Sequence, residues 1–201
     1  MALRTPRAAP ASRTRLDTAG WLAGARRRPS PNCDPRPDGA PITLIVVHGI
    51  SLPPGEFGGD GVERLFTNRL DARAHPYYAT IAHLRVSAHF FVDRAGSVVQ
   101  FVPCALRAWH AGASSWRGRE RCNDFSVGIE LEGTDTRPYT ARQYNRLARL
   151  VCTLRQRYPI AHVAGHSDVA PGRKTDPGPA FEWRRLGELL GERAPPRSRA
   201  R

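Results

Sequence analysis

The chain has 201 residues, of which 40% are hydrophobic, and a formal net charge of +13. It is long enough to form one domain with its own core. It lacks the run of about 18 apolar residues that a membrane span requires, so no membrane association is predicted. Its four cysteines form no close pair and no Cys-x-x-Cys motif, which excludes a zinc knuckle or a thioredoxin-type site and favours free thiols.

Most of the positive charge lies near the two ends of the chain. Residues 1–36 contribute +6 and residues 191–201 contribute +3. Arginine and alanine dominate these regions, and Lys174 is the only lysine. We interpret this charge as compositional bias, so no specific nucleic-acid partner is predicted.

The domain organisation follows from composition. Residues 1–15 and 193–201 are basic and poor in large apolar side chains, so we expect disordered tails there. Residues 16–192 are predicted to form a single folded domain. No apolar segment follows the basic N-terminal residues, so no secretory signal is predicted, and we expect the protein in the cytoplasm.

The first third of the chain predicts a short helix, a coil, a buried strand and a second helix. Residues 16–28 are expected to be helical. Five prolines in residues 29–41 favour extended coil. The continuous apolar run at 42–48 is typical of a central strand that is buried on both faces. Residues 62–70 predict another short helix.

The middle of the chain predicts three strands. Residues 88–92 and 98–102 flank a loop that contains Gly96, which indicates a β-hairpin. Residues 126–132 form a further strand in which apolar side chains alternate with two acidic ones, Glu130 and Glu132.

The last third predicts two helices around a short strand. A helix begins at Thr140, where Gln143 completes a capping box, and ends before Pro159. A strand at 162–164 and a helix at 181–192 follow, the latter with inward-facing Trp183, Leu186, Leu189 and Leu190. The predicted fold is therefore α/β (α+β), with a mixed central sheet flanked by helices.

The loop at 165–179 combines turn signals with reactive side chains. Two Pro-Gly dipeptides indicate that this stretch is neither a regular helix nor a central strand. The same loop contains His166, Lys174 and Asp176, while His48 ends one predicted strand and Glu130 stands on another. These are the parts of a zinc hydrolase: three ligands, a carboxylate that moves protons and a cation for an oxyanion. Spacing alone does not rank the histidines, and five others remain eligible ligands: His75, His83, His89, His110 and His162.

Five motifs together resemble one enzyme family. They are VVHGISLPPG at 46–55, SAH at 87–89, RAWHAG at 107–112, NDFSVGIELEG at 123–133 and GHSDVAPGRKTDPGP at 165–179. In order and separation they resemble the bacterial anhydro-N-acetylmuramoyl-L-alanine amidases of the AmpD type. These are cytoplasmic zinc enzymes of cell-wall recycling, and they share a fold with phage amidases and peptidoglycan-recognition proteins. The match covers roughly residues 18–190.

The resemblance implies a role for each matching residue. It implies one Zn²⁺ held by His48, His166 and Asp176, with Glu130 as the acid/base and Lys174 as the oxyanion stabiliser. It also implies that the substrate is an anhydro-muropeptide, and it predicts no obligate protein partner. The residues expected to contact this substrate are Arg85, Trp109, His110 and Arg121.

One position departs from the family pattern. The family often has Asn after the first ligand, where this chain has Gly49. A side-chain amide contact to substrate is therefore expected to be missing, while all proposed metal ligands are retained. Three alternatives to the recycling enzyme stay open: an amidase that acts on intact peptidoglycan, a non-catalytic muropeptide-binding module and, least favoured, a nucleic-acid binder.

Overall fold

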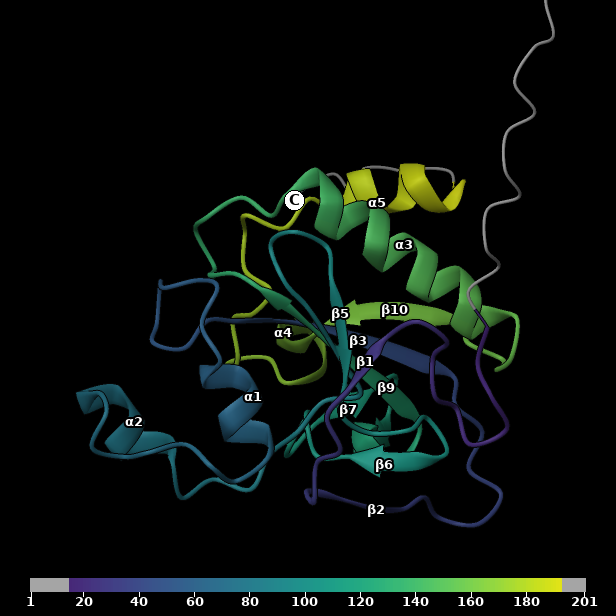
Figure 1. Ribbon diagram of the computed structural model, residues 1–201. Coiled ribbons are helices and arrows are strands. Elements are labelled where there is room, and N and C mark those ends of the chain that lie inside the picture. The colour runs from purple at the N-terminus through teal and green to yellow at the C-terminus, as the bar shows by residue number, and fades with distance from the viewer. Residues whose placement is uncertain (1–14, 193–201) are drawn as a thin grey trace, which may run out of the picture.

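The computed structural model describes residues 15–192 (Figure 1). Apart from Arg15, the two basic tails predicted at 1–15 and 193–201 lie outside this range. Among the described residues, no helix combines the length and the apolar character that crossing a membrane demands.

A six-stranded mixed sheet forms the centre of the fold and confirms the predicted architecture. Its strand order is β1-β5-β4-β9-β3-β10. Four neighbouring strands run parallel to one another, and β5 pairs antiparallel with β4 as the predicted hairpin. The strands are β1 (Arg26–Arg27), β5 (Val98–Gln100), β4 (Phe90–Val92), β9 (Ser126–Glu132), β3 (Leu44–Ile50) and β10 (His162–Gly165).

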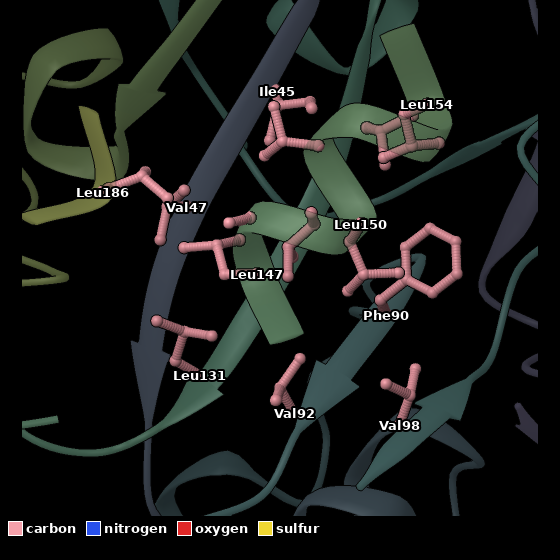
Figure 2. Close-up of a cluster of buried hydrophobic side chains, with 14 of the residues drawn as sticks. Ile45, Val47, Phe90, Val92, Val98, Leu131, Leu147, Leu150, Leu154 and Leu186 are labelled. Atoms are coloured by element: carbon pink, nitrogen blue, oxygen red, sulfur yellow. The ribbon is translucent and has the colours of Figure 1, made fainter. Parts of the chain in front are cut away.

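Two helices, α3 (Ala141–Arg155) and α5 (Trp183–Leu190), lie against one face of this sheet (Figure 1). The predicted capping box starts α3, because the Thr140 hydroxyl accepts from Gln143 N and the Gln143 side chain accepts from Thr140 N. Leucines of α3 meet strand side chains such as Val47 in the larger core cluster (Figure 2). Burying one such side chain stabilises the fold by roughly 1.5–3 kcal/mol.

The opposite face of the sheet is also covered, since Leu44 and Val46 of β3 belong to a buried cluster with Phe125 and Val169, which explains why residues 44–47 are all apolar. The short helix α1 (Gly61–Phe66) packs Leu65 and Phe66 against Phe91 and Val99. The other elements outside the central sheet are α2 (Pro76–Ile81), α4 (His166–Val169), the 3-10 helix η1 (Cys122–Asp124), and the strand pairs β2 (Cys33–Pro35) with β6 (Leu106–Ala108) and β7 (Ser115–Trp116) with β8 (Arg119–Glu120).

The helix predicted at 16–28 is wrong. These residues form turns, an isolated bridge between Leu16 and Leu22, and the strand β1. The buried Gln100 side chain accepts a hydrogen bond from Leu22 N at 2.7 Å and donates one to Gly20 O at 2.8 Å. This side chain therefore holds the segment against the sheet edge and satisfies backbone groups that a helix would have paired internally.

Three smaller differences concern two short elements and the exposure of one helix. The coil predicted at 29–41 contains the short strand β2. The loop at 165–179 opens with the single helical turn α4. In α5, Leu186 faces inward as expected, but Trp183 and Leu189 are 39% and 44% exposed, so their predicted burial is wrong.

Candidate active site

The register of three parallel strands gathers the polar residues of the predicted site. In the pairing of β3 with β9, His48 lies opposite Glu130. In the pairing of β10 with β3, Gly165 lies opposite Val47, so His166 follows at the level of His48. All three residues therefore stand at the carboxyl ends of neighbouring parallel strands, where binding sites of such sheets commonly form.

Three ligand atoms form a compact triangle at this edge. His48 Nδ1 lies 2.9 Å from His166 Nδ1 and 3.2 Å from Asp176 Oδ2, and His166 Nδ1 lies 3.1 Å from that oxygen. Zinc bonds of about 2.0–2.1 Å in tetrahedral geometry separate neighbouring ligand atoms by about 3.3 Å. The nitrogen and carboxylate donors and their spacing therefore fit zinc. Within residues 15–192, no other set of three His, Cys, Asp or Glu side chains comes together in this way.

The far nitrogens of both imidazoles have hydrogen-bond partners. His166 Nε2 donates to the carbonyl oxygen of Ala111 at 3.3 Å. His48 Nε2 lies 3.0 Å from His110 Nδ1, and His110 Nε2 lies 3.1 Å from the Ser126 hydroxyl. A carbonyl can only accept, so in the neutral His166 ring the proton sits on Nε2 and the Nδ1 lone pair is free. Such partners orient a metal-binding histidine and fix its tautomer.

Burial and charge set the protonation of the ligands. Burial lowers the pKa of His48 to about 4, which keeps its ring neutral. Burial alone would raise the pKa of Asp176, but its close contacts with His166 and His48 outweigh burial and hold this pKa well below its usual range. The site therefore presents a neutral His48 imidazole and an ionised Asp176 carboxylate, which are the forms that coordinate a metal.

Glu130 is a buried carboxyl group beside the triangle. Glu130 is 8% exposed, and its Oε1 lies 4.0 Å from His48 Nδ1. Burial, followed by the negative charge of Asp176, raises the pKa of Glu130 well above its ordinary value. Its other oxygen, Oε2, has no hydrogen-bond partner among the described residues. A buried carboxyl with a raised pKa and an unpaired oxygen is suited to exchange protons with a bound molecule.

A cavity of about 390 Å³ opens over these groups. Lys174 and Trp109 line it together with the triangle and Glu130. The Trp109 indole donates to Asp34 Oδ1 at 3.1 Å, which holds the ring in place. His110 also lines the cavity, but its two ring nitrogens already contact His48 and Ser126.

The two arginines predicted to contact substrate do not line this cavity. Arg85 is exposed and donates to nearby backbone carbonyls such as that of His83 at 3.2 Å. Arg121 lies in a neighbouring hollow with Arg173, and its side chain is 70% exposed beside Asp124. Their contribution to substrate binding stays a prediction.

Sequence reasoning missed one wall of the cavity. Helix α2 and the residues after it contribute the apolar side chains of Tyr77, Ile81 and Leu84. Apolar periodicity does not reveal this helix, because none of its residues is buried. A start signal was present, since His75 accepts from Tyr77 N as the N-cap and Pro76 occupies the first helical position.

Comparison with known proteins identifies the family. A profile of the N-acetylmuramoyl-L-alanine amidase family matches residues 38–179. The protein named 1,6-anhydro-N-acetylmuramyl-L-alanine amidase AmpD from Escherichia coli (strain K12) is 59% identical over 175 residues, which cover 86% of this chain and 96% of the relative.

Solved structures agree in fold as well as in sequence. The crystal structure of a Se-Met AmpD derivative matches with a TM-score of 0.85 and 60% identity, over 87% of this chain and 98% of that one. Escherichia coli AmiD, in complex with anhydro-N-acetylmuramic acid-L-Ala-D-gamma-Glu-L-Lys, matches with a TM-score of 0.57 and 29% identity, over 89% and 66% of the two chains. The chain therefore belongs to the N-acetylmuramoyl-L-alanine amidase family, and it is an amidase of the AmpD type.

Proposed function

We propose that residues 16–192 form one zinc amidase domain that hydrolyses the amide between anhydro-N-acetylmuramic acid and L-alanine in muropeptides during cell-wall recycling. The observation that carries this proposal is the ligand triangle of His48, His166 and Asp176 beside the buried Glu130. The reaction named for the 59% identical relative supports the substrate. The ligand bound to AmiD, an anhydro-muramyl peptide, supports the same chemical class.

The chain supplies all the groups that amide hydrolysis needs. A zinc ion held by His48, His166 and Asp176 would supply a Lewis acid and lower the pKa of a bound water molecule. Glu130 then takes the proton of the attacking water and passes it to the leaving nitrogen. The ammonium group of Lys174 stabilises the negative charge that develops on the carbonyl oxygen.

The cavity walls favour a molecule with both apolar and polar parts. The Trp109 ring offers a flat face to the sugar, and Leu84 and Ile81 stand on an apolar wall. Displacement of water from this cavity strengthens the electrostatic contacts of the polar floor. Arg85 and Arg121 carry guanidinium groups that suit the carboxylates of the peptide through bidentate pairing.

Turnover of a defined soluble substrate tests the proposal. Purified protein is incubated with anhydro-muropeptide, with zinc or after removal of metal by a chelator, and products are identified by mass spectrometry. We expect release of anhydro-N-acetylmuramic acid and free peptide only with metal. Cleavage that persists after complete metal removal, or none by zinc-loaded protein, would refute the proposal.

Glu130→Gln separates catalysis from binding. It keeps the shape of the side chain but removes proton transfer, so we expect zinc content to stay the same and turnover to fall about 10²–10⁴-fold. The exposed Glu188→Gln is the matched control and is expected to leave both unchanged. Equal turnover by Glu130→Gln and wild type would exclude the assigned role.

Two further comparisons define the setting of the reaction. Digestion of intact sacculi, measured beside turnover of soluble muropeptide, distinguishes the recycling enzyme from a wall-degrading amidase. We also propose that the enzyme acts in the cytoplasm, where recycled muropeptides are processed, without an obligate protein or nucleic-acid partner. Cell fractionation with antibody detection is the test, and recovery from the cell envelope would contradict it.

A further inference from the structure

A tyrosine between β9 and α3 contacts the loop that carries the third ligand. Tyr139 is 3% exposed, and its hydroxyl donates to the carbonyl oxygen of Pro177 at 3.0 Å. Pro177 directly follows Asp176, whose carboxylate completes the ligand triangle. Within residues 15–192, this is the only hydrogen bond from a side chain to the backbone of residues 175–178.

The loop around Asp176 otherwise rests on close backbone packing. Asp176 O accepts from Ser167 N at 2.9 Å. A Cβ atom built on Gly165 would lie 3.0 Å from Pro177 Cδ, and one built on Gly178 would collide with the backbone of Asp135. Two glycines, Gly165 and Gly178, therefore allow close packing at this segment, and the Tyr139 hydroxyl adds a hydrogen bond from a side chain.

Gly49, which follows the ligand His48, provides the space for this hydroxyl. A Cβ atom built on Gly49 would lie 2.3 Å from Tyr139 Oη, a distance that real atoms do not adopt. The same Cβ would lie 3.6 Å from Tyr139 Cζ and 3.5 Å from Pro177 Cα, which are ordinary contacts. Only the oxygen atom of Tyr139 therefore conflicts with a side chain at position 49.

Gly133 provides space for the ring in a different way. A Cβ atom there would lie 2.4 Å from Cε1 and 2.8 Å from Cζ of Tyr139. These atoms belong to the ring itself, so removing the hydroxyl does not relieve this conflict. Substitutions at Gly49 and Gly133 therefore separate the effect of the Tyr139 oxygen from the packing of its ring. The ring also contacts Phe181, at a centroid distance of 5.5 Å.

We propose that Tyr139 is a positioning residue for the ligand Asp176, and that the absence of a side chain at Gly49 is what admits its hydroxyl. Position 49 thus lacks the side-chain amide that the family often has, and the space is occupied by the Tyr139 hydroxyl, which binds the loop that carries Asp176. This inference rests on the proposed zinc site, and it adds a residue, Tyr139, that is not one of the proposed metal ligands.

Zinc affinity of purified variants tests the inference, measured by competition with a chromogenic chelator. Partners of metal ligands typically contribute 10- to 100-fold to affinity, so we expect Tyr139→Phe to weaken zinc binding about tenfold. Excess zinc should restore its turnover, because Tyr139→Phe leaves Glu130 and the ligands intact. Circular dichroism and melting of the metal-free proteins monitor folding separately.

A double-mutant cycle identifies the atom responsible. Gly49→Ala should weaken zinc binding in the wild-type background and have no further effect in the Tyr139→Phe background, where its Cβ finds ordinary contacts. Gly133→Ala should remain harmful in both backgrounds. Gly59→Ala, whose Cβ would meet nothing closer than 3.9 Å, is the neutral control.

The possible outcomes differ clearly. Equal zinc affinity of Tyr139→Phe and wild type, or an equal effect of Gly49→Ala in both backgrounds, would overturn this inference and leave the zinc amidase intact. Loss of metal-free stability with unchanged zinc affinity would also overturn it, since that is the signature of a purely structural tyrosine. Failure of the wild type to bind zinc would overturn the proposed function and the inference together.

Discussion

Arg36 offers a quantitative test of how the N-terminal segment supports the site. Its guanidinium group donates to four backbone carbonyl oxygens and contacts His89 Nε2 at 3.0 Å. The carbonyls belong to Cys104 at 3.0 Å, Asn123 and Asp124 at 3.1 Å, and Ser126 at 2.8 Å. Ser126 begins strand β9, which carries Glu130. Burial lowers the pKa of Arg36 to about 10, so the group stays charged at neutral pH.

Replacing Arg36 with Met keeps much of the volume and removes every donor. Each buried acceptor left without a partner costs about 1–3 kcal/mol, but removing a buried charge recovers part of this loss. We therefore expect the free energy of unfolding to fall by about 3–5 kcal/mol, the usual range for breaking a buried charged network. With a urea dependence of about 2 kcal/mol per M, the unfolding midpoint should fall by about 2 M.

Urea unfolding followed by tryptophan fluorescence measures this effect. The control is Arg64→Met, which removes an ion pair with Asp60 between two largely exposed side chains. Such pairs contribute about 0.3–0.5 kcal/mol, so the control midpoint should barely move. If Arg36→Met and Arg64→Met shift the midpoint equally, water replaces the guanidinium group and our reasoning about these carbonyls is wrong.

Three further predictions concern the site and the core. His110→Ala removes the partner of His48 Nε2 and should weaken zinc binding about 10- to 100-fold in a chelator competition; unchanged affinity would show that His110 does not orient the ligand. Lys174→Met should lower kcat by about 10²–10³ at unchanged zinc content if its charge stabilises the oxyanion, and equal kcat would exclude that role. Leu147→Ala leaves a cavity at a fully buried position of α3 and should cost about 2–5 kcal/mol of unfolding free energy. Replacing the half-exposed Leu189 with Ala should cost under about 1 kcal/mol, and similar losses from the two substitutions would contradict the burial described.

The elements near the site were predictable where a local pattern had one dominant cause. The continuous apolar run of β3 follows from burial on both faces of a parallel sheet. The alternation in β9 follows from one apolar face and one face that carries Glu130 and Glu132. The start of α3 follows from a capping box that the structure contains. The mixed sheet with flanking helices could therefore be inferred before any coordinates were known.

Long-range contacts explain what could not be predicted. The segment at 16–28 reads as a helix, but a side chain of β5, Gln100, determines its conformation from 78 residues away along the chain. By residue type, His110 and His89 were indistinguishable from His48, the proposed ligand. Strand register distinguishes them, because it places His48 opposite Glu130 and beside the start of α4. Register depends on pairing partners that a single sequence does not reveal.

The strand order also relates formation of the site to assembly of the sheet. Strand β10 is the edge strand next to β3, and it precedes both His166 and Asp176 in the chain. His48 and Glu130 become neighbours when β3 pairs with β9, whereas the other two proposed ligands, His166 and Asp176, join them only when β10 pairs with β3. Parallel pairing between such distant segments is slow, because loop closure precedes the stabilising contacts. We therefore expect the metal to be captured at the end of folding, by a sheet that has already assembled without it.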